Sequence, residues 1–418
     1  MRSFPDALVF ALLLSLAVFA AVLGLTAMSA SEALLAWSQA LWSLNAFAFQ
    51  MCLVLFLGQL LALSPPVSHV LVRGAQLVPS ATWAPPLLTL LSLVACYLNW
   101  GLGLMVAATA ALHLAQRFPT LSPGVLLASG YAGFLIWHAG PSGSIPLSIA
   151  GDDKVLRDLA LSPIPLSQTL FAPATLQLVL LLSLALVLTS YVIARQQRSR
   201  TTESFTLAPS SEEAVIHESF GSRLLLKGLG AALLTGLVMS LKKQNSFDIN
   251  HANLLFLALN AFAWPGIQTL LRVLPRSAQN LGPLLLQYPL YAALMGLMQA
   301  SGLGDVLTRT FQSWASAESF PLWSFLSAGV LNFIIPSGGG QWVIQGPILM
   351  KSALALGVDP ARTAMAIAWG DAWTNMIQPF WALPLLTLTR RPLSELMVPA
   401  LVYLLVSGVV LALGLRFL

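Results

Sequence analysis

The stretch FIIPSGGGQWVIQGP, from Phe333 to Pro347, lies inside a long apolar segment in the last quarter of the chain. It combines proline, three consecutive glycines, a serine and two glutamines, which are residues that break helices or form hydrogen bonds. At membrane depth, non-helical backbone is tolerated only where protein covers it or where it lines a water-filled cavity. In a membrane protein, the stretch therefore predicts a helix that is interrupted for a functional reason.

The composition of the 418-residue chain is that of an integral membrane protein. Hydrophobic residues make up 57% of it and charged residues only 8%, with a mean hydropathy of +0.81. Soluble proteins average about 25% charged residues. Several apolar segments reach the ~20 residues that a spanning helix needs, so we predict an all-α integral membrane protein, a polytopic helical bundle in the lipid bilayer. The net charge of +5 lies mostly in short loops, where it sets membrane orientation, and does not indicate nucleic-acid binding.

The apolar segments fall into two halves. Residues 1–194 form the predicted N-terminal transmembrane repeat, and residues 223–418 form the C-terminal one. Between them, residues 195–222 are rich in charge, serine and threonine, as in a solvated linker. Three arginines between positions 195 and 200 follow a helix end, so the positive-inside rule predicts that the linker is cytoplasmic.

Each half contains one long segment with a glycine-rich centre and one with internal prolines. Segments 84–115 and 320–350 are too long for one crossing and contain NWGLG and PSGGGQ, so we predict two re-entrant hairpins. Segments 122–150 and 361–388 contain HAGPSGSIP and GDAWTNMIQP, so we predict two helices that are broken inside the membrane.

The two halves also share short sequence matches. Asn99 pairs with Asn332 at an offset of 233 (332 − 99), and PSGSIPL from Pro141 pairs with PFWALPL from Pro379. Chance matching in leucine- and proline-rich sequence is the competing interpretation. Provided that segment 223–241 crosses the membrane, counting crossings puts the mouths of the two hairpins on opposite sides. We therefore predict two inverted repeats, an arrangement typical of secondary transporters.

The interruptions contain the residues that we expect to bind substrate. The free amides and the positive dipole end of a helix attract a carboxylate, and glycine lets the anion approach the backbone. For isolated glycines, close helix packing is the competing interpretation. The predicted substrate-binding residues are Asn99, Gly101, Ser142, Gly143, Ser144, Asn332, Ser337, Gly338, Gly339, Gly340, Gln341 and Gln378.

Asp371 is an acidic residue well inside a predicted membrane segment, where charged groups usually mark an ion or proton path. Together with Thr374 and Asn375, we expect it to bind the coupling ion, H⁺ or Na⁺, and we expect no other cofactor. The competing interpretation is a buried ion pair of Asp371 with Lys351 or Arg362. We interpret His138 as a core histidine in preference to a proton relay.

Two stretches in the second half and two in the first resemble the AtoE-type short-chain fatty acid transporters. They are LNFIIPSGGGQWVIQGPI from Leu331, AWGDAWTNMIQPFWALPLL from Ala368, YLNWGLGL and HAGPSGSIPLSIAG. The resemblance covers nearly the whole chain outside the linker. It implies a multi-pass permease for short-chain carboxylates such as butyrate or acetoacetate, which we expect in the inner membrane of a bacterial cell. A homodimer is compatible with this expectation.

The resemblance also extends to the broader ion-transporter superfamily, whose hairpin tips hold a carboxylate and Na⁺ with serine, asparagine and threonine groups. The residues of this chain that match those groups are Asn99, Asn332, Ser337, Thr374 and Asn375. The tips lack a contiguous Ser-Asn-Thr sequence, and this departure leaves Na⁺ coupling open.

The residues and the resemblance together predict a secondary active transporter, not an enzyme. It would move a short-chain monocarboxylate with H⁺ or Na⁺ by alternating access around the two hairpins. A passive small-anion channel built on the same interruptions is one alternative. An intramembrane serine hydrolase that uses Ser142 is another, but Pro141 disrupts the helical geometry that would bring His138 to this serine as a base.

Overall fold

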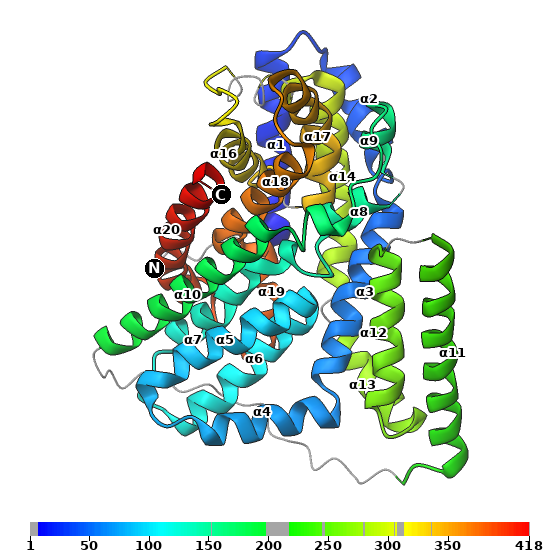
Figure 1. Cartoon of the computed structure of the whole chain (residues 1–418), viewed down its shortest axis with the longest axis vertical. Coiled ribbons are helices and arrows are strands. Elements are labelled where there is room, and N and C mark those ends of the chain that lie inside the picture. The colour runs from blue at the N-terminus through cyan, green and yellow to red at the C-terminus, as the bar shows by residue number, and fades with distance from the viewer. Residues whose placement is uncertain are drawn as a thin grey trace.

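The computed structural model describes residues 7–151, 153–197, 217–244, 247–278, 281–304, 306, 313–335 and 337–417, and their regular secondary structure is helical (Figure 1). The helices of the first half are α1 (Ala7–Leu25), α2 (Ala30–Ala40), α3 (Asn45–Ala62), α4 (Pro65–Leu77), η1 (Ala81–Trp83), α5 (Ala84–Leu98), α6 (Trp100–Arg117), α7 (Pro123–Ala132), η2 (Gly133–Ala139), α8 (Ser144–Ala150), α9 (Lys154–Asp158), η3 (Leu166–Gln168) and α10 (Pro173–Gln196). Those of the second half are α11 (Phe220–Gln244), α12 (Ile249–Ala263), α13 (Ile267–Ala278), α14 (Leu281–Ser301), α16 (Phe320–Asn332), α17 (Gly338–Leu356), α18 (Pro360–Thr374), η4 (Asn375–Ile377), α19 (Pro379–Thr389) and α20 (Leu393–Phe417).

The predicted class, a helical membrane protein, agrees with the apolar helices. Within the part of the chain that the structure describes, five helical segments are long and apolar enough to cross a membrane. They are Asn45–Ala62, Ala81–Leu98, Pro173–Gln196, Phe220–Gln244 and Leu393–Phe417. α10 and α11 bury little of their apolar surface in the protein, which leaves that surface for lipid. Residues 198–216 of the predicted linker lie outside the described residues.

Each predicted hairpin segment consists of two helices, and the residue directly before the second helix has extended backbone. Asn99 has extended backbone between α5 and α6, and its Oδ1 accepts a hydrogen bond from the amide of Leu102 at 2.9 Å. Ser337 has extended backbone before α17, and its Oγ accepts a hydrogen bond from the amide of Gly340 at 3.3 Å. Both breaks therefore end in a side chain that caps the helix that follows, the usual role of asparagine and serine there.

The two predicted broken helices are also interrupted where glycine, proline and polar residues cluster. In the first, η2 follows α7 and residues 140–143 separate it from α8. In the second, α18 passes into η4, and Gln378 has extended backbone before α19. Contacts then link the halves, because η2 packs against α18, α6 against α19, and α7 against α20. This packing brings the interruptions of the two halves together in the centre of the molecule.

Glu218 attaches the beginning of α11 to the beginning of α13. Its Oε1 accepts hydrogen bonds from the amide and hydroxyl of Thr269 at 2.6 and 2.7 Å, and its Oε2 accepts one from Ser222 at 2.6 Å. Burial alone would raise the pKa of this carboxyl group. The hydrogen bonds from Ser222, Thr269 and the Gln268 amide outweigh that effect and lower the pKa to about 2.

This lowered pKa predicts how stability depends on pH. The pKa falls from its ordinary 4.5 to about 2 in the folded chain, so the ionised carboxylate stabilises the fold above the ordinary value and the contribution is lost as the pH falls toward the lower one. We expect Glu218→Gln to lower the thermal unfolding midpoint of the detergent-solubilised protein by a few degrees at neutral pH. The difference from the wild type should shrink as the medium is acidified.

Glu318→Gln is the matched control for that measurement. The Glu318 side chain is 77% exposed and bonds Arg416 at the surface, where an ion pair contributes little to stability. Equal midpoints for the wild type and Glu218→Gln at neutral pH would show that the carboxylate does not anchor α11.

Candidate functional site

The tip of the second helix pair lies directly against the first broken helix. A side-chain carbon placed on Gly338, the first residue of α17, would lie 2.7 Å from the His138 ring and 2.7 Å from Ser144 Oγ. Within the first broken helix, a carbon on Gly143 would lie 2.5 Å from the backbone carbonyl oxygen of His138. Such distances are shorter than a real side-chain carbon tolerates. Glycine at 338 therefore permits the two interruptions to meet, and glycine at 143 permits the chain to pass close to the backbone of His138.

At this meeting point, His138 of η2 pairs with Asp371 of α18. The Nε2 atom of His138 lies 2.9 Å from Oδ2 of Asp371, and both side chains are fully buried. The amide of Asn375 donates a longer hydrogen bond, 3.3 Å, to the same carboxylate oxygen. The acidic group of one half is therefore held by the histidine of the other half.

The competing interpretation of Asp371 as an ion-pair partner of Lys351 or Arg362 is wrong. Arg362 donates instead to the carbonyl oxygen of Leu415 at 2.8 Å. Sequence reasoning placed His138 in the core, where it lies, but missed that its partner is Asp371. These two residues are 233 positions apart, whereas the match of Pro141 with Pro379 gives this region an offset of 238 (379 − 141), so the repeat pattern did not mark the pair.

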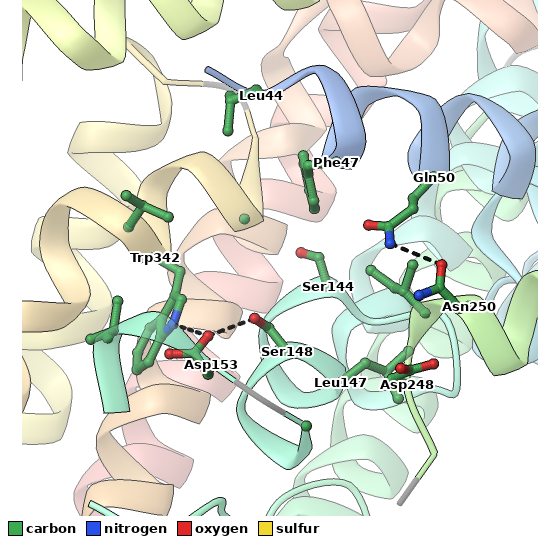
Figure 2. A pocket seen from close by; sticks show the side chains of 15 residues that line it. Leu44, Phe47, Gln50, Ser144, Leu147, Ser148, Asp153, Asp248, Asn250 and Trp342 are labelled. Atoms are coloured by element: carbon green, nitrogen blue, oxygen red, sulfur yellow. Dashed lines mark hydrogen bonds between the residues drawn. The ribbon is translucent and has the colours of Figure 1, made fainter. Parts of the chain in front are cut away.

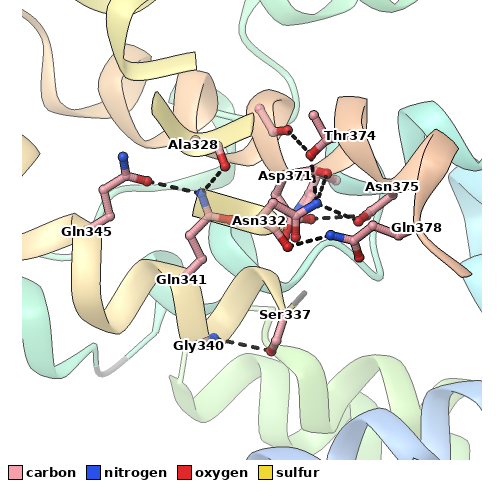
Figure 3. Close-up of polar contacts among 12 residues, drawn as sticks. Ala328, Asn332, Ser337, Gly340, Gln341, Gln345, Asp371, Thr374, Asn375 and Gln378 are labelled. Carbon is pink, nitrogen blue, oxygen red and sulfur yellow. Dashed lines mark hydrogen bonds and ion pairs between the residues drawn. The ribbon is translucent and has the colours of Figure 1, made fainter. Parts of the chain in front are cut away.

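Asn332, the last residue of α16, connects the second helix pair to the second broken helix (Figure 3). Its Nδ2 lies within hydrogen-bonding distance of three oxygens: Asp371 O at 2.8 Å, Thr374 Oγ1 at 2.9 Å and Asn375 Oδ1 at 2.8 Å. In return, the side-chain amide of Gln378 donates to the carbonyl oxygen of Asn332. The structure thus brings together these five predicted site residues in one buried network.

In the first half, the equivalent connection runs through Ser142. Its hydroxyl oxygen accepts a hydrogen bond from the amide of Trp100 at 3.1 Å, next to the cap formed by Asn99. Nucleophilic catalysis by serine needs a histidine base at its hydroxyl. The Nε2 atom of His138 is directed instead to Asp371, so this arrangement does not favour the hydrolase alternative.

The remaining predicted residues differ in their surroundings. Gly101 lies against α3, where an added carbon would come within 2.8 Å of Val54 O, so its surroundings are those of a packing glycine. The side-chain amide of Gln341 donates to Ala328 O at 2.8 Å and to Gln345 at 3.0 Å, which ties α17 to α16. Gly340 contributes the amide that Ser337 caps. Roles in substrate binding stay predictions for these residues.

A partly open cavity of about 310 Å³ begins beside this tip (Figure 2). Ser144 and Gly339 line it, together with Phe47 and Gln50 of α3 and Trp342 of α17. Residues 248–250 at the start of α12 line it as well, so the cavity lies where four separate parts of the chain meet, at the start of α17. Sequence reasoning missed the contribution of α3, because an ordinary apolar helix carries no local mark of such a role.

Two acidic residues also line the cavity, and both already have hydrogen-bond donors. Asp153 accepts from Ser148 at 2.6 Å, from Trp342 Nε1 at 3.0 Å and from the amide of Leu156 at 3.1 Å. Asp248 pairs with His251 Nδ1 at 2.6 Å. Since donors surround each carboxylate, their repulsion of an anion in the cavity is reduced.

Several buried polar atoms at the interruptions have no hydrogen-bond partner among the described residues. They are Ser144 Oγ, His138 Nδ1, Asp371 Oδ1, Asn332 Oδ1 and Gln378 Oε1. Buried polar groups without partners are costly, so a water molecule, ligand or ion bound at these atoms would be stabilised by them. The oxygens of Asp371, Asn332 and Gln378 are of the kind that a hard cation such as Na⁺ prefers. Carboxylates and imidazoles, such as those of Asp371 and His138, are also the side chains that most often transfer protons in proteins. Over the described residues, no group of three His, Cys, Asp or Glu side chains has the spacing of a metal site.

The fold is that of a helical protein with several apolar helices, and the sequence comparisons identify its family. The family model described as "Short chain fatty acid transporter" matches residues 1–418. The chain therefore belongs to the short-chain fatty acid transporter family. The family match confirms the resemblance. The family and its relatives are transporters and not enzymes, which agrees with the expectation that this chain is not an enzyme.

Two relatives, both provisionally named short-chain fatty acid transporters, match nearly end to end. The one from Escherichia coli (strain K12) is 34% identical over 428 residues, covering 99% of this chain and 96% of the relative. The one from Haemophilus influenzae (strain ATCC 51907 / DSM 11121 / KW20 / Rd) is 33% identical over 430 residues, with the same coverage.

Two solved structures are similar over most of the chain at low sequence identity. The Alcanivorax borkumensis YdaH transporter is 17% identical with a TM-score of 0.49, covering 97% of each chain. Neisseria gonorrhoeae MtrF is 12% identical with a TM-score of 0.46, covering 99% of this chain and 95% of MtrF.

The contact of Gly338 with His138 and Ser144 predicts that a larger side chain there stops transport. We expect Gly338→Leu to reduce uptake of labelled butyrate into proteoliposomes at least tenfold, because the added carbons must displace the α17 tip from the first broken helix. Gly236→Leu is the matched control, since nothing lies within 4 Å of a carbon added at Gly236. Normal uptake by Gly338→Leu, at equal amounts of membrane protein, would refute the assignment of this tip.

Proposed function

We propose that the protein is a secondary active transporter that moves short-chain monocarboxylates, such as butyrate or acetoacetate, across the bacterial inner membrane. The observation that carries the proposal is the buried contact between the two halves at His138, Asp371 and Gly338. A group that joins both halves at their interruptions is in a position to respond to movement of one half against the other. The substrate class follows from the family and from the names of the relatives.

In this proposal, the carboxylate binds at the N-terminal turn of α17. The first amides of a helix have no partner within it, and the dipole of this 19-residue helix favours an anion at that end. Ser144 Oγ, buried and without a partner among the described residues, supplies a hydroxyl donor from the first broken helix. The predicted substrate-binding residues nearest to this position are Ser144, Ser337, Gly338, Gly339 and Gly340.

In this proposal, the other predicted substrate-binding residues hold the N-terminal turn of α17 in place. Asn332, Gln341 and Gln378 join α16, α17 and α18 in the buried network. Asn99, Gly101, Ser142 and Gly143 connect the first helix pair with the break in front of α8. They act in substrate binding by positioning the tips.

For coupling, we propose that Asp371, Thr374 and Asn375 bind the coupling ion, H⁺ or Na⁺, with His138 as a further partner. With a neutral imidazole, the empty pair carries one negative charge from Asp371. A monocarboxylate adds a second negative charge to a buried site, which is unfavourable without a compensating cation. One H⁺ or Na⁺ per substrate restores the charge of the empty site, so we expect electroneutral symport.

Alternating access would use the two halves as inverted repeats. We propose that hairpins 84–115 and 320–350 are re-entrant, that broken helices 122–150 and 361–388 face each other, and that linker 195–222 is cytoplasmic. The order of helix pair and broken helix is the same in both halves, and His138 of one broken helix meets Asp371 of the other, which supports this arrangement. A homodimer stays a prediction.

Asp371→Asn and His138→Gln test the coupling mechanism. Both variants keep a hydrogen-bonding side chain of similar size but remove the charge of the carboxylate or the basic nitrogen. We expect at least a tenfold loss of butyrate accumulation driven by a pH or Na⁺ gradient in proteoliposomes. Exchange of labelled for unlabelled butyrate, which requires no net movement of the coupling ion, should persist.

The same assay separates the alternatives. With the membrane potential clamped at zero, a passive anion channel equilibrates butyrate and does not accumulate it in response to an imposed Na⁺ gradient. Gradient-driven accumulation by Asp371→Asn with unchanged ion dependence would show that Asp371 is structural. Imposing pH and Na⁺ gradients separately identifies the coupling ion in the wild type.

A further inference from the structure

We propose that the cavity beside α17 is the compartment for the acyl chain of the substrate, and that Phe47 of α3 limits the chain length. We call this cavity the acyl compartment and define it by Phe47, Ser144, Leu147, Gly339, Trp342 and Val343, which are among its lining residues. The inference rests on the proposed function, because it concerns the tail of the same substrate. It adds a residue from a helix outside the hairpins and the broken helices.

The position of Phe47 relative to the helix tip is the main observation. A side-chain carbon placed on Gly339 would lie 2.5 Å from the Phe47 ring, so the ring covers the first turn of α17. That turn is where the proposed function places the substrate carboxylate. An acyl chain that starts there therefore meets the Phe47 ring within a few carbon atoms.

The polar and apolar groups of the acyl compartment suit a short amphipathic anion. Ser144 Oγ lies at its inner side, is 1% exposed and has no hydrogen-bond partner among the described residues. Phe47 and Ser144 point into the same space from opposite sides, as Figure 2 shows. A carboxylate at Ser144 and the α17 amides would direct its tail toward Phe47, Leu147 and Val343, so one end of the substrate is hydrogen-bonded and the other is covered by carbon.

The size of the compartment agrees with a small ligand. Its volume of about 310 Å³ is at the lower end of the ~300–1,000 Å³ that small-molecule pockets occupy. Longer acids would have to displace a side chain or leave methylene groups outside. A pocket that gains or lacks room for one methylene group discriminates by roughly 10–200-fold.

Among the bulky residues of the acyl compartment, Phe47 has the contacts expected of a residue that limits the length of the acyl chain. Trp342 is held by the hydrogen bond of its Nε1 to Asp153 at 3.0 Å, so its replacement would also break a polar contact. Phe47 has an apolar side chain and rests edge-on against the Tyr288 ring, with centroids 6.4 Å apart. This support fixes the ring position, and replacing Phe47 changes only space and apolar surface.

The test is the chain-length profile of uptake into proteoliposomes. Labelled acetate, butyrate, hexanoate and octanoate are supplied to the wild type, Phe47→Ala and Phe47→Trp. We expect Phe47→Ala to raise the ratio of hexanoate to butyrate uptake at least about tenfold, and Phe47→Trp to lower the ratio of butyrate to acetate uptake. Phe49→Ala is the matched control on the same helix, since Phe49 is 64% exposed and lines no part of the compartment, and its profile should equal that of the wild type.

The outcomes distinguish this inference from the proposed function. If the wild type takes up none of the four acids under any gradient, the proposed function fails. If it takes up butyrate and both Phe47 variants keep the wild-type profile, the chain-length role of Phe47 is refuted while the proposed function stands. Phe47→Leu replaces Phe47→Ala should the smaller side chain prevent folding, with the same direction of change expected.

Discussion

The structure depends on one buried interaction, the contact of His138 with Asp371. A carboxylate at membrane depth is costly unless a partner compensates it, and at 2.9 Å from a fully buried carboxylate oxygen the imidazole is that partner. One group comes from the end of η2 and the other from α18, so the pair can form only if the two broken helices meet. Gly338 permits the tip of α17 to pack against this site, because a side chain there would collide with the His138 ring and Ser144.

A second constraint is the hydrogen bonding of the interrupted backbone. Where a helix unwinds inside a membrane protein, its freed amides and carbonyls need partners. Asn99 and Ser337 cap the helices that follow them, Ser142 accepts from Trp100, and Asn332 joins three oxygens of the second broken helix. Most polar side chains of the interruptions thus stabilise the breaks. Ser144 is different, because its buried hydroxyl has no partner among the described residues and remains available to a ligand.

The positions of the interruptions could be predicted from the sequence, and the partners across them could not. Glycine, proline and capping residues act on their own few neighbours, so NWGLG, PSGSIP and PSGGGQ mark the places where helices end. Asp371 was recognisable as a buried acid by the same local reasoning. Its competing interpretation named the basic residues Lys351 and Arg362 as partners, whereas the structure pairs it with His138, 233 positions away.

The sequence by itself determined that the chain is a helical membrane protein, that it belongs to the short-chain fatty acid transporter family, and where its helices break. These properties depend on composition, on hydropathy and on motifs whose residues are close together in the chain. Only the tertiary structure decided that His138 meets Asp371, that Asp153 accepts from Trp342, and that Phe47 covers Gly339. Each of these contacts joins helices far apart in the chain, and such contacts depend on how whole helices pack, which no local pattern encodes.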